Sequence, residues 1–187
     1  YTVTKDPKKI FSLTKKAVAF MKKNVANNNP FYLQLSHYAV HSSFQMKSST
    51  LNKYNNKPKG KFQIDAGLAA MTENLDEGIG LILKKIKELG IENNTYVIYM
   101  SDNGGVPNVP GAKKYINSYN YPLKRGKWDA MEGGIRVPFV ISGPGIEAGK
   151  QCNYPVSNCD ILPTISSLAG NENEEFSKID GGSLKLL

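Results

Sequence analysis

The sequence predicts an α/β fold, with a mostly parallel sheet flanked by helices. Short apolar, β-prone runs alternate with helical repeats in the order strand, helix, strand, loop, strand, helix. The longest helical repeat carries a continuous apolar stripe, which is typical of a helix packed on a core. With 187 residues and 40% hydrophobic content, the chain can bury the core of one domain. We therefore expect residues 1–187 to form a single α/β domain with no membrane span.

The first half of the chain begins with a helix and a strand. Asp6 followed by Pro7 is a typical helix start, and the apolar spacing that follows predicts a helix that ends between Asn27 and Pro30. Phe31–Ser36 has the composition of a buried strand. His37 and His41 come after that strand and are expected to diverge, so we do not pair them as metal ligands. Ser42–Lys61 is polar and aperiodic, which predicts a surface loop.

The second helix is the clearest element in the sequence. Apolar residues recur every three or four positions across Ile64–Leu89, and Gly90 is placed to end the helix. Val97–Ser101 and Val137–Ile141 are β-prone and should join Phe31–Ser36 in one sheet, with this helix packed across it.

A long segment and a short helix complete the chain. Val106–Gly134 is rich in Gly, Pro, Asn and Tyr, and segments this long in compact domains are usually functional. Asn158 can cap a last helix that Gly170 closes, with these residues facing inward: Ile161, Leu162, Ile165 and Leu168.

Two oxygen-bearing side chains, Asp102 and Asn103, follow the Val97–Met100 run and precede Gly104 and Gly105. Ligands of open α/β sheets bind beyond the carboxyl ends of strands, and such oxygens suit Ca²⁺ or Mg²⁺. Asn-Gly is also the strongest short hairpin signal. The spacing alone leaves a metal site and a simple turn both open.

The net charge of +8 favours anionic partners, such as nucleic acid, acidic glycans, or phosphate and sulfate esters. The lysines are scattered on predicted helix faces, and aromatic and basic residues do not alternate as in nucleic-acid recognition motifs. Cys152 and Cys159 have neither the spacing nor the histidine neighbours of a zinc site. We expect them to be small core residues or to form a local disulfide.

Several motifs occur in an order that resembles the sulfatases of the arylsulfatase type, in the alkaline phosphatase superfamily. They are Phe31–Ser36 leading to Ala39–His41, Ala70–Asp76, Ser101–Gly105, Pro122–Lys127, Glu132–Pro138, Asp160–Thr164 and Asp180–Ser183. The resemblance covers essentially the whole chain. It implies an alkaline-phosphatase-like fold. It also implies an intact enzyme that hydrolyses sulfate esters around a bound divalent cation, Ca²⁺ or Mg²⁺.

The resemblance also implies roles for individual residues. Asp102 and Asn103 match two metal ligands of the family, Lys127 matches the lysine that contacts the sulfate, and His41 matches the histidine near the leaving-group oxygen. We expect these four residues to gather at one edge of the sheet. Glu132 and Arg136 are expected to hold their loop by charge-assisted hydrogen bonds.

The chain also departs from the family pattern. The family nucleophile is a formylglycine made from Cys or Ser in a C/S-x-P/A-x-R motif, and no segment here has that motif. The paired N-terminal aspartates of the metal site and the smaller domain after Asp180 are also missing. Lys124 and Arg125 stand where the family commonly has Arg-Gly, which leaves Lys124 as an alternative to Lys127.

These departures indicate a middle or C-terminal fragment of a sulfatase catalytic domain, inactive by itself, because its nucleophile lies outside this chain. The intact protein is expected to be periplasmic, secreted or otherwise exported, with a signal peptide that this chain does not contain.

The expected partner is a small-molecule or glycan sulfate ester, not nucleic acid, with specificity carried by the loops Ser42–Lys61 and Val106–Lys127. Two other functions remain open. One is a phosphodiesterase or phosphonate hydrolase of the same superfamily. The other is a non-catalytic basic domain that binds sulfated glycans or nucleic acid.

Overall fold

The structure, a computed structural model, describes residues 1–107, 120–171 and 178–185. These residues form two compact units, Tyr1–Pro144 and Gly145–Leu187. Within the described ranges, no helix combines the length and the apolarity needed to cross a bilayer.

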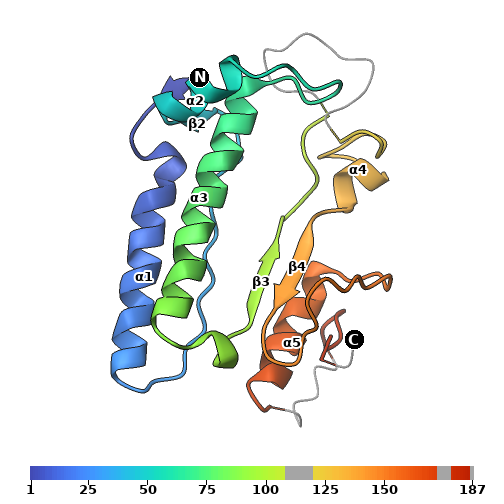
Figure 1. Cartoon of the computed structure of the whole chain (residues 1–187). Helices are drawn as coiled ribbons and strands as arrows, with labels where there is room; N and C mark the ends of the chain where they lie inside the picture. Colours follow the sequence, from blue (N-terminus) through green and yellow to red (C-terminus); the bar gives the residue numbers. More distant parts are fainter. Residues whose placement is uncertain (108–119, 172–177, 186–187) are drawn as a thin grey trace. The chain divides into compact units, whose positions relative to one another are not determined.

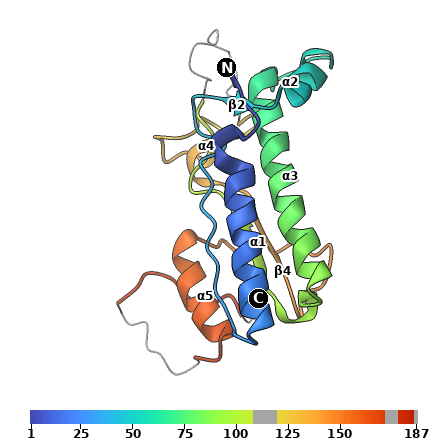
Figure 2. The ribbon, with the colours of Figure 1, turned by 90° about the vertical axis from the view of Figure 1, so that its left-hand side faces the viewer.

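Two long helices dominate the first unit. Helix α1 spans Ile10–Ala26, helix α3 spans Ala66–Glu88, and the two run side by side (Figures 1 and 2). Both helices confirm the sequence prediction within a few residues at each end. The carboxylate of Asp65 caps α3 by accepting a hydrogen bond from the Leu68 N–H at 2.7 Å.

The predicted helix start at Asp6 is present in a modified form. A short 3₁₀ turn, η1, occupies Pro7–Lys9 before α1 begins. The Asp6 carboxylate reaches past this turn, accepting from the backbone N–H of Phe11 at 2.8 Å and from the Ser12 hydroxyl. Burial works to raise the pKa of Asp6, but the hydrogen bonds from Ser12 and Phe11 outweigh it, so the pKa is lowered.

The core of the first unit lies between these helices and the segment that follows residue 43. Its buried apolar side chains are Ile10, Ala17, Met21, Phe44, Met46, Ala70, Met71, Leu75 and Ile86. Asn74 is also fully buried. It accepts from the Lys47 N–H at 3.0 Å and donates to the Thr50 hydroxyl at 2.9 Å.

The prediction that Ser42–Lys61 is only a loop is wrong. Strand β2, Gln45–Met46, pairs in parallel with β1, Thr2–Val3, and helix α2 spans Ser48–Asn55 and packs on α3. Helix α2 buries Thr50 but is otherwise largely polar, so it has no apolar periodicity to detect. Its first turn is fixed from outside by Asn74, a contact that local sequence cannot reveal.

The prediction of one mostly parallel sheet is also wrong for the described residues. Strands β3, Val97–Met100, and β4, Phe139–Ser142, are the longer pair, and they run antiparallel with Val97 opposite Ser142 (Figure 1). The order of elements suggested parallel crossovers, but the long connection between these strands returns the chain in the opposite direction.

Phe31–Ser36 is not assigned to a strand, although its side chains behave as in one. Exposure alternates residue by residue from Phe31 to Val40, which is the period of a strand. On the exposed face, the Tyr32 hydroxyl donates to Gln34 at 3.0 Å. No strand in the described part of the chain pairs with this segment, and every second side chain is exposed, so the prediction of a buried strand is wrong here.

The second unit contains η3, Asn158–Asp160, and α5, Ile161–Leu168. Ser157, rather than Asn158, forms the cap, in a reciprocal capping box with Asp160. The inward position predicted for Leu162 is wrong, because 58% of it is exposed whereas Thr164 is buried. Thr164 and Asp160 instead accept hydrogen bonds from the Leu184 and Gly182 N–H groups, both at 2.9 Å.

Cys152 and Cys159 are both exposed and unbonded. The expectation that they are core residues or form a local disulfide is therefore wrong. Their apolar character suggested burial, but the second unit is small and leaves both side chains at its surface.

Candidate functional site

The candidate site is built from three glycine-containing segments joined by their backbones. The Gly104 N–H donates to the Gly134 carbonyl at 2.8 Å, and the Lys127 N–H donates to the Gly105 carbonyl at 2.9 Å. The Gly133 N–H donates to the Lys124 carbonyl at 2.8 Å. These bonds hold the Asp102–Gly105, Lys124–Lys127 and Glu132–Gly134 motifs against one another.

Glycine is required where these backbones meet. A Cβ atom on Gly104 would lie 2.7 Å from the Gly133 carbonyl carbon and 2.9 Å from the Gly134 Cα. A Cβ on Gly133 would lie 2.6 Å from the Lys124 carbonyl oxygen. Real Cβ atoms essentially never approach other atoms this closely, so the segments interlock only because these positions lack side chains.

Asn120 and Asp129 support this arrangement, and sequence analysis did not identify either of them. The Asn120 amide donates to the Gly105 carbonyl at 2.7 Å and to the Arg125 carbonyl at 3.0 Å. Asp129 pairs with Arg125 at 2.6 Å and accepts from the Met131 N–H at 2.9 Å. The Arg125 hydrogen bond, with that from Met131, lowers the pKa of Asp129. The hydrogen bond from the Met131 N–H to the Asp129 carboxylate forms a local Asp turn. Turns of this type can be expected from the sequence, because Asp side chains often accept from the backbone two residues further on.

Glu132 and Arg136 pair with each other across one short helix. Helix α4 spans Glu132–Ile135, and the Arg136 guanidinium lies 3.2 Å from the Glu132 carboxylate. Both side chains are exposed, so the pair contributes little to stability.

Asp102 and Asn103 lie directly beyond the end of β3, as predicted. The Ser101 hydroxyl donates to the Asn103 carbonyl at 2.9 Å, and the Asn103 amide nitrogen donates to the Gly104 carbonyl at 2.9 Å. The amide oxygen of Asn103 is thus left to act as an acceptor or ligand, and the Asp102 side chain is exposed.

The donor set fits two of the oxygen ligands that a hard divalent cation takes. Within the part of the chain that the structure describes, no three His, Cys, Asp or Glu side chains gather closely enough to hold a metal ion. Further oxygens would be needed to complete a calcium site, because Ca²⁺ takes roughly six to eight.

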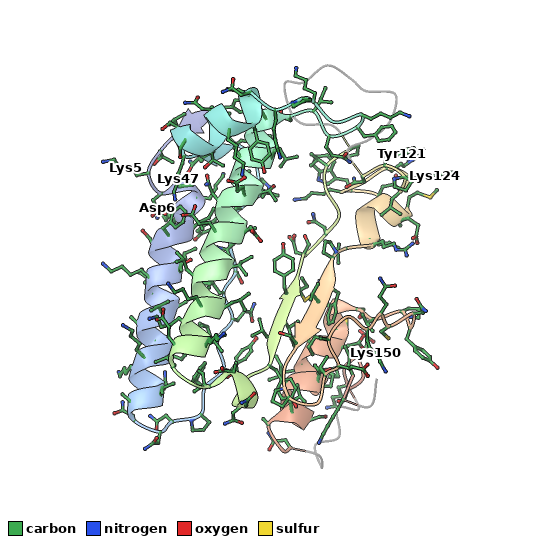
Figure 3. All side chains as sticks on the ribbon, viewed as in Figure 1. Lys5, Asp6, Lys47, Tyr121, Lys124 and Lys150 are labelled. Atoms are coloured by element: carbon green, nitrogen blue, oxygen red, sulfur yellow. The ribbon has the colours of Figure 1, made fainter. Side chains whose placement is uncertain are left out.

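The two candidate lysines differ in their surroundings. Lys127 is partly buried, and its backbone is bonded directly to Gly105, two residues after Asn103. Lys124 is exposed, and Figure 3 shows it on the same segment as Tyr121. The structure therefore brings the Lys127 backbone next to the Asp102–Gly105 motif.

His41 makes contacts of another kind. Its backbone N–H donates to the Tyr38 carbonyl at 3.0 Å, and its Nδ1 lies 2.7 Å from the Ser42 carbonyl oxygen. That carbonyl also accepts from the Lys8 ammonium at 3.2 Å. The gathering of His41 with Asp102, Asn103 and Lys127 stays a prediction.

Comparison with known proteins identifies the family. The sequence profile described as Sulfatase matches residues 9–171. The chain belongs to the sulfatase family. The identification made from the ordered motifs is therefore confirmed.

Similar sulfatases include the human steryl-sulfatase, which is 34% identical over 174 residues, covering 92% of this chain and 28% of the relative. Among solved structures, Ps i-CgsB in complex with k-i-k-neocarrahexaose is 34% identical with a TM-score of 0.78, covering 92% of this chain and 36% of that one. The PsFucS1 sulfatase from Pseudoalteromonas sp. is 26% identical with a TM-score of 0.67, covering 84% and 29% respectively.

These structural similarities confirm the predicted sulfatase fold. The chain spans about a third of the length of the relatives it matches.

Proposed function

We propose that this chain works as part of a sulfuric ester hydrolase. The observation that carries the proposal is the backbone interlock that sets Lys127 beside the Asp102–Gly105 motif, in a chain of the sulfatase family. Asp102 and Asn103 would hold a divalent cation, Ca²⁺ or Mg²⁺. When bound, such a cation neutralises charge on the sulfuryl oxygens.

The other residues act on the substrate directly. The Lys127 ammonium pairs with the sulfate and stabilises negative charge that develops during cleavage. His41 donates a proton to the departing alkoxide oxygen. Because no C/S-x-P/A-x-R motif occurs in the sequence, we assign the formylglycine nucleophile to a segment outside these 187 residues. We further propose that the intact protein is exported.

Binding tests the sulfate-contact role separately from turnover. On adding 4-nitrophenyl sulfate with Ca²⁺, we expect NMR shift changes at the amides of Gly104, Gly105 and Lys127. Lys127→Ala should remove these changes, whereas Lys150→Ala, a change of equal charge in the second unit, should leave them. Ligand-induced shift changes that persist in Lys127→Ala would contradict the assignment. Their loss in Lys124→Ala alone would move the role to Lys124. Preference for 4-nitrophenyl phosphate would indicate a phosphate-ester hydrolase instead.

Turnover is the second test. The 187-residue chain should not hydrolyse 4-nitrophenyl sulfate above the level of its Asp102→Ala variant, because the residues present orient a sulfate but do not attack it. Calcium-dependent release of 4-nitrophenol by the chain, lost in Asp102→Ala, would mean that a residue within it serves as nucleophile.

A further inference from the structure

A lysine-rich segment connects α2 to α3. Lys57, Lys59 and Lys61 are all exposed. Among the described residues, none of the three pairs with a carboxylate, whereas Lys47 pairs with Glu77 at 2.9 Å and Lys53 with Glu73 at 2.6 Å. The ammonium groups of this segment are therefore more available to an anionic ligand than those of Lys47 and Lys53. Lys57 nevertheless adds to the hydrogen bond from Lys53 in lowering the pKa of Glu73.

An aromatic contact joins this basic segment to the candidate site. The rings of Phe62 and Tyr121 have centroids 4.0 Å apart. Tyr121 belongs to the same segment as Lys124, as Figure 3 shows, and that segment continues to Lys127. The connection between α2 and α3 thus meets the segment that leads to Lys127 through these rings, one residue beyond the predicted specificity loop Ser42–Lys61.

The segment also has aromatic surface among its charges. The Lys61 ammonium lies 5.3 Å from the centre of the Phe62 ring, and the Lys57 ammonium lies 5.4 Å from that of Tyr54. Tyr121 remains 45% exposed despite its contact with Phe62. Exposed ring faces suit the apolar C–H faces of sugars, while the ammonium groups suit sulfates.

We propose that Lys57, Lys59 and Lys61, with Tyr121, form an accessory subsite for a second sulfated sugar. This inference rests on the proposed function and narrows its substrate class to a sulfated oligosaccharide. A single aryl or steryl sulfate has one anionic group, and Lys127 already accounts for it. Three further unpaired ammonium groups match a ligand that carries several anions along a chain.

The test compares two triple variants of equal charge. In the first, Lys57, Lys59 and Lys61 are changed to Gln; in the second, Lys15, Lys16 and Lys23, all exposed on α1, are changed to Gln. Calorimetry measures binding of a carrageenan hexasaccharide, and NMR measures binding of 4-nitrophenyl sulfate. The loop variant should bind the hexasaccharide roughly tenfold more weakly, given the modest strength of each exposed ion pair. It should bind 4-nitrophenyl sulfate unchanged.

The control variant should lose less than about twofold in hexasaccharide affinity, because the α1 lysines contribute only to the long-range electrostatic attraction that comes from the net positive charge. Equal losses in the two triple variants would overturn the subsite, as would a loop variant that binds the hexasaccharide normally. The subsite would also be overturned if duplex DNA bound to Lys57, Lys59 and Lys61 with the same affinity as the hexasaccharide and displaced it. Lys127→Ala should weaken the binding of both the hexasaccharide and 4-nitrophenyl sulfate. If it weakens neither while the loop variant behaves as expected, the proposed function is wrong and the subsite is not.

Discussion

Replacing Gly104 by Ala tests whether the backbone interlock holds the site together. The new methyl group would meet the Gly133 carbonyl group and lie 2.9 Å from the Gly134 Cα, all of it backbone that cannot rotate away. The Gly104–Gly134 hydrogen bond of 2.8 Å would have to open. Overpacking costs about 1–3 kcal/mol and the lost hydrogen bond about 1 kcal/mol, so we expect a loss of about 2–4 kcal/mol.

Gly80→Ala is the matched control for this change. Gly80 lies in the middle of α3, and a Cβ there would meet nothing within 4 Å. The same substitution should therefore raise stability by up to about 1 kcal/mol, because Ala favours a helix over Gly.

Urea unfolding gives the stability of each variant, and hydrogen exchange reports on the site itself. In Gly104→Ala, the amides of Lys127 and Gly133 should lose protection, because their acceptors in the interlock move; in Gly80→Ala they should keep it. The interlock would be refuted if Gly104→Ala were as stable as the wild-type chain and retained protection at both amides.

Three further changes probe the capping carboxylate, a buried histidine and a strained position. Asp6→Asn should cost about 1 kcal/mol at neutral pH, because Phe11 and Ser12 then face a neutral amide instead of a charged carboxylate. Because the folded pKa of Asp6 is lowered, that stability should be lost as pH falls below about 4, and acid unfolding curves should converge there. Burial lowers the pKa of His37, so below about pH 6.5 the unfolded chain binds a proton there before the folded chain does, and the wild-type protein loses stability. His37→Phe should reduce this loss, and an unchanged pH profile of stability would contradict the prediction. Arg125 has φ +58°, so Arg125→Gly should be about 1 kcal/mol more stable than Arg125→Ala by thermal melting; equal stability would show that the backbone strain is absent.

The two long helices and strands β3 and β4 were predictable because their signals are local. Ala66–Glu88 has an apolar stripe over its whole length, and Val97–Met100 has a β-prone composition that ends at a polar corner. Helix α2 was missed because Asn74, far along the chain, satisfies its first turn. Phe31–Ser36 shows the opposite case: its β-prone composition is a local signal, but a strand also needs hydrogen-bonded pairing with a second segment, which composition does not reveal.

The candidate site was predictable in its residue types but not in its construction. The motifs around Asp102 and Lys127 identified the family, yet nothing in their spacing indicates that Gly104 packs on Gly133. Asn120 was missed because its role is to donate to two backbone carbonyl groups, those of Gly105 and Arg125, and the first lies 15 residues away in sequence. Backbone contacts of this kind leave no pattern in the side chains that a sequence displays.

The interlock also explains how the chain tolerates its departure from the family at Lys124 and Arg125. Where the family commonly has Gly, Arg125 adopts a left-handed backbone, which favours glycine. Its ion pair with Asp129 at 2.6 Å and the Asn120 hydrogen bond to its carbonyl offset that cost. The backbone of Lys127 is held by its own N–H, which donates to the Gly105 carbonyl at 2.9 Å. A side chain can therefore change at position 125 while the Lys127 backbone keeps its place beside Asp102 and Asn103.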